Sequence, residues 1–208
     1  MKSIAIVTDS NCGISPSQAK DLGIYMLPMP FFIDEKEYLE DIDMNQAEFF
    51  QYLEQHPECH VSTSQPTPES VTTLWDSLLK DYDEIVHIPM SSGLSASCAT
   101  AQMLAEDYEG RVFVVDNHRI SISQKSSAWD AVALREAGCG AQEIQRELAE
   151  QLRRLKDPRV SQVGMVSITR VDTTGDLRYA RVYISVLDKS REKEVLKGLK
   201  SAAGFLRR

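Results

Sequence analysis

The residues best placed to do chemistry are four serines within seven positions. They are Ser91, Ser92, Ser95 and Ser97, grouped around Gly93. A short apolar run (residues 85–89) precedes them and an Ala-rich helical pattern follows. A strand, a small polar turn and a helix N-terminus together present hydroxyls and backbone N–H groups to an anion such as a carboxylate or a phosphate. The alternative interpretation is an ordinary turn whose serines cap a helix.

Polar residues also follow other predicted strands. Residues 8–10 (Thr-Asp-Ser) and 116–117 (Asp-Asn) each end an apolar run, and residues 63–64 (Thr-Ser) precede a helix start. The carboxyl ends of parallel strands meet at one edge of a sheet, where α/β proteins bind ligands. Hydroxyls that converge there, assisted by backbone N–H groups and a helix dipole, hold an anion without a full positive charge. We therefore expect an anion site at this edge.

Catalytic and metal-binding patterns are weak. The sequence lacks a G-x-S-x-G elbow, a P-loop and a G-x-G-x-x-G turn. His87 within a strand pattern and His118 on a turn are candidate bases, but lone histidines more often pack or lie at the surface. We expect no enzyme activity.

The cysteines and their neighbours do not indicate a metal centre. His56, Cys59 and His60 cluster in a Pro-containing loop, where a surface position is more common than a metal site. The four cysteines lack C-x-x-C spacing, which is typical of reduced packing residues. No apolar run approaches a membrane span, and the N-terminus lacks the layout of a secretory signal. We expect a cytoplasmic protein without a metal.

The elements that must position the polar turns alternate along the first two-thirds of the chain. Apolar runs predict strands, and capping residues followed by helical spacing predict helices. The strands are expected at residues 3–8, 24–33, 37–39, 85–88 and 111–116, and the helices at 16–23, 45–52, 68–80, 95–108 and 123–137. This order predicts an α/β fold: a parallel, doubly wound sheet with flanking helices.

The last third has a different pattern. Residues 141–156 form an amphipathic helical pattern, residues 160–171 and 178–187 indicate two strands, and a helix is expected from 190 to 208. A turn at residues 173–176 joins the strands as an antiparallel pair. The predicted order is therefore α-β-β-α.

Charge divides the chain in the same place. Residues 1–142 hold 8 Lys and Arg against 22 Asp and Glu, whereas residues 143–208 hold 15 against 9. The acidic part should repel nucleic acid and the basic part should attract it. This split favours two units with different partners, although a chance distribution over one domain gives the same numbers.

Residues 4–142 resemble the DegV family of bacterial fatty-acid-binding proteins. The matching motifs, in family order, are IVTDS (Ile6–Ser10), TSQP (Thr63–Pro66), SSGLS (Ser91–Ser95) and VVDNHRISISQ (Val114–Gln124). The resemblance implies an α/β domain that binds one long-chain fatty acid and needs no cofactor. It also implies a fatty acid kinase as a partner. It assigns the carboxylate to Thr63 and Ser95. The other polar residues of the turns complete the expected ligand set: Ser10, Ser64, Ser92 and Ser97.

Two departures from the family bear on this site. Ala96 and Ser97 stand where the family usually has Gly and Thr, and a methyl group at Ala96 crowds the backbone if that position needs a positive φ. The family's second domain, which completes the pocket and brings a basic side chain to the carboxylate, is not in this sequence. We therefore expect an incomplete lipid site.

Residues 143–208 resemble ribosome-binding factor A. The matching stretches are KDPRV (156–160), VSITRVDTTGDLRYARVYISVL (166–187) and LKSAAGFLRR (199–208). The resemblance implies a partial KH-like fold that contacts 16S rRNA of the small ribosomal subunit. It assigns phosphate contacts to Arg178, Lys200, Arg207 and Arg208. The alternatives are a solvated basic face, or a segment that only covers the neighbouring sheet.

The sequence thus predicts two domains, residues 1–142 and 143–208. The favoured function is fatty acid binding by the first. The alternative is RNA binding in small-subunit maturation by the second.

Overall fold

The protein is described by a computed structural model that covers residues 2–150, 166–173, 180–186, 190 and 192–197. It divides into two compact units, Met1–Ala149 and Glu150–Arg208. Helix α6 (Ala141–Glu150) packs its Ile144 and Leu148 into the core of the first unit. The domain boundary after residue 142 stays a prediction.

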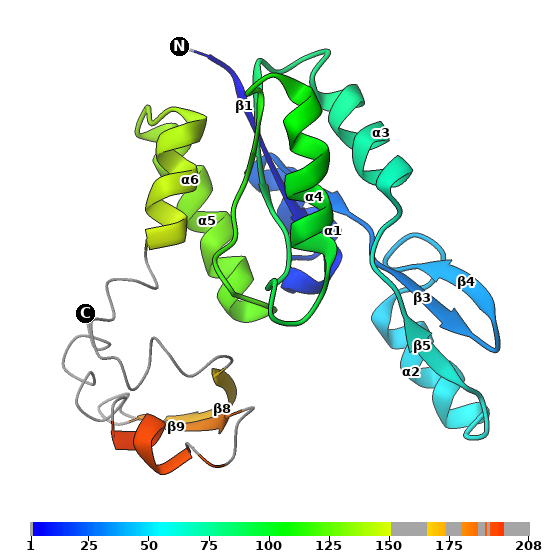
Figure 1. The fold of residues 1–208 in the computed structure, drawn as a ribbon. Helices are drawn as coiled ribbons and strands as arrows, with labels where there is room; N and C mark the ends of the chain where they lie inside the picture. Colours follow the sequence, from blue (N-terminus) through cyan, green and yellow to red (C-terminus); the bar gives the residue numbers. More distant parts are fainter. Residues whose placement is uncertain (1, 151–165, 174–179, 187–189, 191, 198–208) are drawn as a thin grey trace. The chain divides into compact units, whose positions relative to one another are not determined.

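A four-stranded parallel sheet forms the centre of the first unit (Figure 1). Its order is β2 (Ile24–Leu27), β1 (Ile4–Asp9), β6 (Glu84–Ile88) and β7 (Val112–Val114). Every residue of β1 and β6 is buried, as expected for central strands covered on both faces. The predicted parallel α/β sheet is confirmed.

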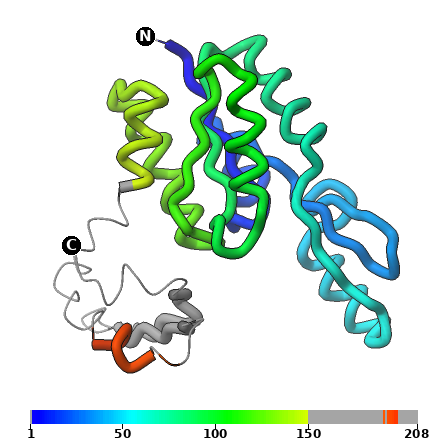
Figure 2. Tube along the Cα trace, in the orientation of Figure 1, coloured from blue at the N-terminus to red at the C-terminus, as the bar shows by residue number. Residues whose placement is uncertain are grey.

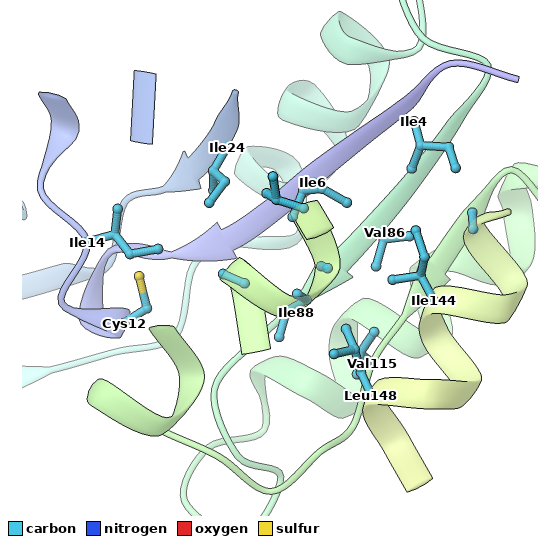
Figure 3. Close-up of a cluster of buried hydrophobic side chains, with 14 of the residues drawn as sticks. Ile4, Ile6, Cys12, Ile14, Ile24, Val86, Ile88, Val115, Ile144 and Leu148 are labelled. Atoms are coloured by element: carbon cyan, nitrogen blue, oxygen red, sulfur yellow. The ribbon is translucent and has the colours of Figure 1, made fainter. Parts of the chain in front are cut away.

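Helices cover both faces of this sheet. Against one face lie α1 (Pro16–Leu22), α5 (Ile122–Glu136) and α6, around a core that includes Ile6, Val86 and Ile144 (Figure 3). Against the other lie α3 (Pro68–Leu78) and α4 (Ser97–Ala105), which enclose Trp75. The doubly wound arrangement is therefore also confirmed.

Local signals place several helix ends as the sequence predicts. Ser15 and Asn45 each form a capping box, and the Thr67 side chain accepts from the Ser70 N–H at the start of α3. Helix α4 begins at Ser97 rather than at the predicted residue 95. The reason is that the Ser95 hydroxyl accepts the Ser97 N–H and so stands ahead of the helix.

A smaller antiparallel sheet lies beside the central one (Figure 2). Its order is β4 (Lys36–Leu39), β3 (Pro30–Ile33) and β5 (Val61–Thr63), and α2 (Gln46–Gln55) accompanies it. The strand predicted at 24–33 is divided here, because β2 ends before Pro28 and β3 begins at Pro30. The Phe31 ring stacks on Tyr38 at 5.5 Å and meets Phe49 edge-on at 5.3 Å. This sheet carries Thr63 at the end of β5.

In the second unit, β8 (Val166–Thr173) and β9 (Ala180–Val186) form the predicted antiparallel pair, and residues 192–197 are helical. The four residues expected to contact RNA, Arg178, Lys200, Arg207 and Arg208, lie outside the described residues. Within the part of the chain that is described, every helix is too short or too polar to traverse a bilayer.

Candidate functional site

The carboxyl ends of β1 and β6 are joined by buried hydrogen bonds. The Thr8 Oγ1 hydroxyl donates to the Ile88 carbonyl at 2.9 Å. The Gln124 side chain, from α5, donates to both Thr8 Oγ1 (3.1 Å) and the Ile88 carbonyl (3.0 Å). All three residues are fully buried. One helix is thereby fixed to the two strands that precede the polar turns.

The serine-rich turn follows directly from this anchor. The Met90 N–H donates to Asp9 Oδ2 at 2.6 Å, and the Ser91 N–H donates to the Arg119 carbonyl at 2.8 Å. The Ser91 hydroxyl accepts the Gly93 N–H at 3.2 Å. Bonds to β1 and to the loop after β7 therefore hold the turn before it enters α4.

Ser95 and Ser97 lie together at the start of α4. Their hydroxyl oxygens are 2.7 Å apart, and Ser95 Oγ also accepts the Ser97 N–H at 3.1 Å. Ser95 is half-buried and Ser97 is buried. The intervening Ala96 has φ −72° and ψ −5°, so this position does not need a positive φ and the alanine methyl group causes no backbone strain.

Thr63 and Ser64 come from the smaller sheet. Thr63 pairs with Phe31 in the ladder, and the Ser64 N–H donates to the Pro30 carbonyl at 3.2 Å; both side chains are exposed. The next residue, Gln65, donates from Nε2 to Thr100 Oγ1 on α4 at 3.4 Å. This contact links the TSQP segment to the helix that Ser95 precedes.

The Ser10 hydroxyl forms hydrogen bonds with two other segments of the protein. Its hydroxyl donates to Glu40 Oε2 at 2.5 Å and accepts the Met29 N–H at 3.0 Å. These bonds connect the end of β1 to the segments that enter and leave the smaller sheet. Ser10 reaches a ligand only by giving up its bond to Glu40.

Ser92 contacts a histidine at the rim, and that histidine lies near a carboxylate. Ser92 Oγ lies 3.0 Å from His118 Nδ1, and the same nitrogen lies 3.6 Å from Asp116 Oδ1. In a catalytic triad the carboxylate and the nucleophile engage opposite nitrogens of the imidazole. Because both groups here face Nδ1, the geometry differs from that of a serine hydrolase. His118 also has φ 53°, in the left-handed region.

A buried pair behind the turn was missed in the sequence. Asp9 and His87 are 0% and 1% exposed, and His87 Nε2 lies 3.6 Å from Asp9 Oδ1. The Trp75 and His87 rings are nearly perpendicular, with their centroids 5.5 Å apart. In the sequence, this pair is indicated only by an aspartate and a histidine that each lie near the carboxyl end of a predicted strand.

The nearby Cys98 thiol is buried, and its surroundings disfavour the thiolate form. Burial, followed by the charges of Asp116 and Asp9, raises the pKa of Cys98 to about 12. The thiol is therefore protonated at neutral pH. Among the described residues, no group of three or more His, Cys, Asp or Glu side chains is arranged to hold a metal ion.

Two surface cavities lie at the opposite edge of the sheet. One, of about 490 Å³, is lined by residues that include Asp76, Tyr108 and Arg111. The other, of about 520 Å³, is lined by residues that include Lys2 and Glu84. Both are near the amino ends of strands, and neither contains a predicted ligand residue.

Fold, motifs and family comparison agree on the class of protein. The family profile described as "Uncharacterised protein, DegV family" matches residues 3–156, and the chain belongs to this family. A second profile, ribosome-binding factor A, matches residues 138–208.

Curated relatives support the assignment. A DegV domain-containing 15.5 kDa protein of Staphylococcus aureus is 33% identical over 116 residues, which cover 56% of this chain and 81% of that protein. A DegV domain-containing protein of Mycoplasmopsis pulmonis is 33% identical over 115 residues, 55% of this chain and 39% of the relative. Another, from S. aureus strain N315, is 31% identical over 143 residues, 69% of this chain and 50% of the relative. The chain thus spans about half or less of the length of the latter two relatives.

Solved structures share the fold. DegV of Bacillus subtilis, described as a fatty acid binding protein, matches with a TM-score of 0.69 and 22% identity, over 98% of this chain and 79% of that one. The Streptococcus pneumoniae Fatty Acid Kinase B3 protein, loaded with linoleic acid, matches with a TM-score of 0.57 and 16% identity, over 70% and 53%.

Proposed function

We propose that this chain binds a long-chain fatty acid through its carboxylate. The observation that carries the proposal is the anchored turn from Met90 to Ser95, which leads into the N-terminus of α4 while Gln65 links the TSQP segment to the same helix. Membership of the DegV family supports it. Solved relatives described as binding fatty acids, including a stearic acid-binding protein of Eubacterium ventriosum, support the choice of ligand.

Thr63 and Ser95 are the proposed carboxylate donors. Ser95 Oγ already accepts the Ser97 N–H, so its own proton is available either to Ser97 Oγ or to a ligand. An exposed Thr63 has its hydroxyl free to turn toward the same carboxylate. Ser64 and Ser92, also exposed, are proposed to line the rim, and Ser97 supports Ser95.

The proposed role is that of a carrier rather than an enzyme. The Ser92–His118 geometry lacks the alignment of a hydrolase, and the Cys98 thiol stays protonated. The likeness to a Fatty Acid Kinase B3 protein supports a fatty acid kinase as the partner that receives the bound acid, in the cytoplasm. The fatty acid is the only ligand proposed, without a further cofactor.

Native mass spectrometry of the purified full chain after bacterial expression tests this function. We expect a co-purified mass in the range of C16–C18 fatty acids, and its loss in the double variant Thr63→Ala plus Ser95→Ala. The matched control is Thr72→Ala plus Ser126→Ala, because these hydroxyls bond only to their own helices in α3 and α5. Absence of a lipid from the wild type, or equal occupancy in the two double variants, would reject the proposal.

A second candidate function rests on the ribosome-binding factor A match over residues 138–208. Under it, Arg178, Lys200, Arg207 and Arg208 neutralise phosphates of 16S rRNA in the small subunit. The affinity for a 16S rRNA fragment should then fall by about 10-fold or more between 50 and 200 mM salt. Unmeasurable binding at 50 mM salt favours the alternative, in which this segment has a purely structural role.

A further inference from the structure

The buried Asp9–His87 pair has a position that relates it to the proposed ligand site. Val7 on β1 pairs with His87 on β6, and alternation places Asp9 on the same face of the sheet as Val7. The two side chains therefore meet between the sheet and helices α3 and α4, beside Trp75. They lie directly below the point where β6 gives way to the serine-rich turn.

Three atoms of this pair have unused bonding capacity. Asp9 Oδ1, His87 Nδ1 and His87 Nε2 are buried and have no hydrogen-bond partner among the described residues. Native proteins satisfy nearly all buried polar groups, and a buried carboxylate is costly unless it is paired. The 3.6 Å separation of Oδ1 and Nε2 is too long for a hydrogen bond but lies within the distance of an ion pair with a protonated imidazole.

The other oxygen of Asp9 connects the pair to the turn. Asp9 Oδ2 accepts the Met90 N–H at 2.6 Å, and Met90 immediately precedes Ser91. A charge-assisted bond of this length fixes the backbone at the entrance of the turn. Asp9 thereby sets the place from which the turn reaches Ser95.

We infer that Asp9 and His87 are positioning residues for the carboxylate site: Asp9 anchors the turn, and His87 neutralises Asp9 so that a ligand carboxylate is not repelled. This inference rests on the proposed fatty acid function. The second nearby carboxylate, Asp116, has a side chain that is 27% exposed, and its buried Oδ1 lies 3.6 Å from Nδ1 of a separate histidine, His118. Asp9 has only His87 to compensate its charge among the described contacts.

The test compares oleic acid with oleyl alcohol, which has the same chain length without the carboxylate. Asp9→Ala removes the anchor and should weaken oleic acid binding by about 10- to 100-fold, while the affinity for oleyl alcohol changes less than about twofold. Asp9→Asn keeps an acceptor for the Met90 N–H and should stay within about threefold of the wild type for both ligands.

His87→Gln tests whether compensation of the Asp9 charge matters for ligand binding. It leaves the Asp9 charge uncompensated and should weaken oleic acid binding by about 10-fold, with oleyl alcohol unaffected. The double variant Asp9→Asn plus His87→Gln removes that charge and should regain most of the loss. Circular dichroism confirms folding of each variant, and the comparison of His87→Gln with the double variant decides the matter if Asp9→Ala does not fold.

The outcomes that overturn the inference are specific. Equal weakening of both ligands indicates an ordinary structural role, and equal oleic acid affinity of His87→Gln and the double variant removes the charge argument. If the wild type binds neither oleic acid nor oleyl alcohol, the proposed function fails instead.

Discussion

Replacing Ile144 by alanine should destabilise the first unit substantially. Ile144 is fully buried in the core formed with Val86 and Ile6, although it lies beyond the boundary predicted at residue 142 (Figure 3). The change deletes three carbon atoms, worth about 2.4 kcal/mol at about 0.8 kcal/mol per buried group. The cavity left behind adds to this, so we expect a loss of about 3–4 kcal/mol in the free energy of unfolding.

Urea unfolding followed by tryptophan fluorescence measures this loss, because Trp75 is fully buried in the same unit. The matched control is Ile122→Ala, since Ile122 lies in α5 with 69% of its surface exposed and should change stability by less than about 0.5 kcal/mol. If the two variants unfold at the same urea concentration, α6 does not stabilise the first unit and the reasoning is refuted.

Three further predictions concern other parts of the first unit. Cys98, with a pKa of about 12, should react with iodoacetamide at pH 8 at least about 100-fold more slowly in the folded protein than in urea, by mass spectrometry; equal rates contradict this. The hydrogen bond between the Tyr25 and Tyr82 hydroxyls, together with burial, raises the pKa of Tyr25 to about 12, and Tyr82→Phe should lower that pKa in an absorbance titration at 295 nm; an unchanged titration excludes the hydrogen bond as a cause. Ser127→Ala leaves two donors in the loop after β7 without their acceptor and should cost about 2–4 kcal/mol in urea unfolding. Ser126→Ala, whose hydroxyl bonds only within α5, is its control, and equal costs count against the argument.

Cys98 also makes the stability of the folded protein depend on pH. Its pKa is raised on folding from an ordinary value of 9.0, so the unfolded chain releases this proton at a lower pH than the folded chain. The contribution of the protonated thiol to stability is therefore complete below about pH 9 and decreases as the pH rises toward 12.

The elements that local signals define could be predicted from the sequence. Ser15 and Asn45 cap helices because each is followed three residues later by a partner that completes a capping box. Strands β1 and β6 could be predicted because both contain short apolar runs, Ile4–Val7 in β1 and Ile85–Val86 followed by Ile88 in β6, as expected for strands covered on both faces. Likewise, the spacing of Ile144 and Leu148 correctly predicted one buried face of α6.

The partners of polar side chains could not be predicted in the same way. Ser10 stays a predicted ligand residue, but its hydroxyl also bonds to Glu40, which is 30 residues away and belongs to the segment after β4, and no local pattern indicates this partner. Asp9 and His87 meet only because β1 and β6 are neighbours in the sheet, since the two residues are 78 positions apart in the chain. Such contacts depend on strand order and register, and no local pattern encodes either.

The geometry of the serine-rich turn depends on residues outside the turn. The serines of the turn are visible in the sequence, yet their positions depend on bonds to Asp9 and to the Arg119 carbonyl, both contributed by other segments. A site assembled before the ligand arrives loses less conformational entropy on binding. We therefore expect substitutions that break these two anchors to weaken carboxylate binding even when every serine is retained, because the donors then have to be ordered by the ligand itself.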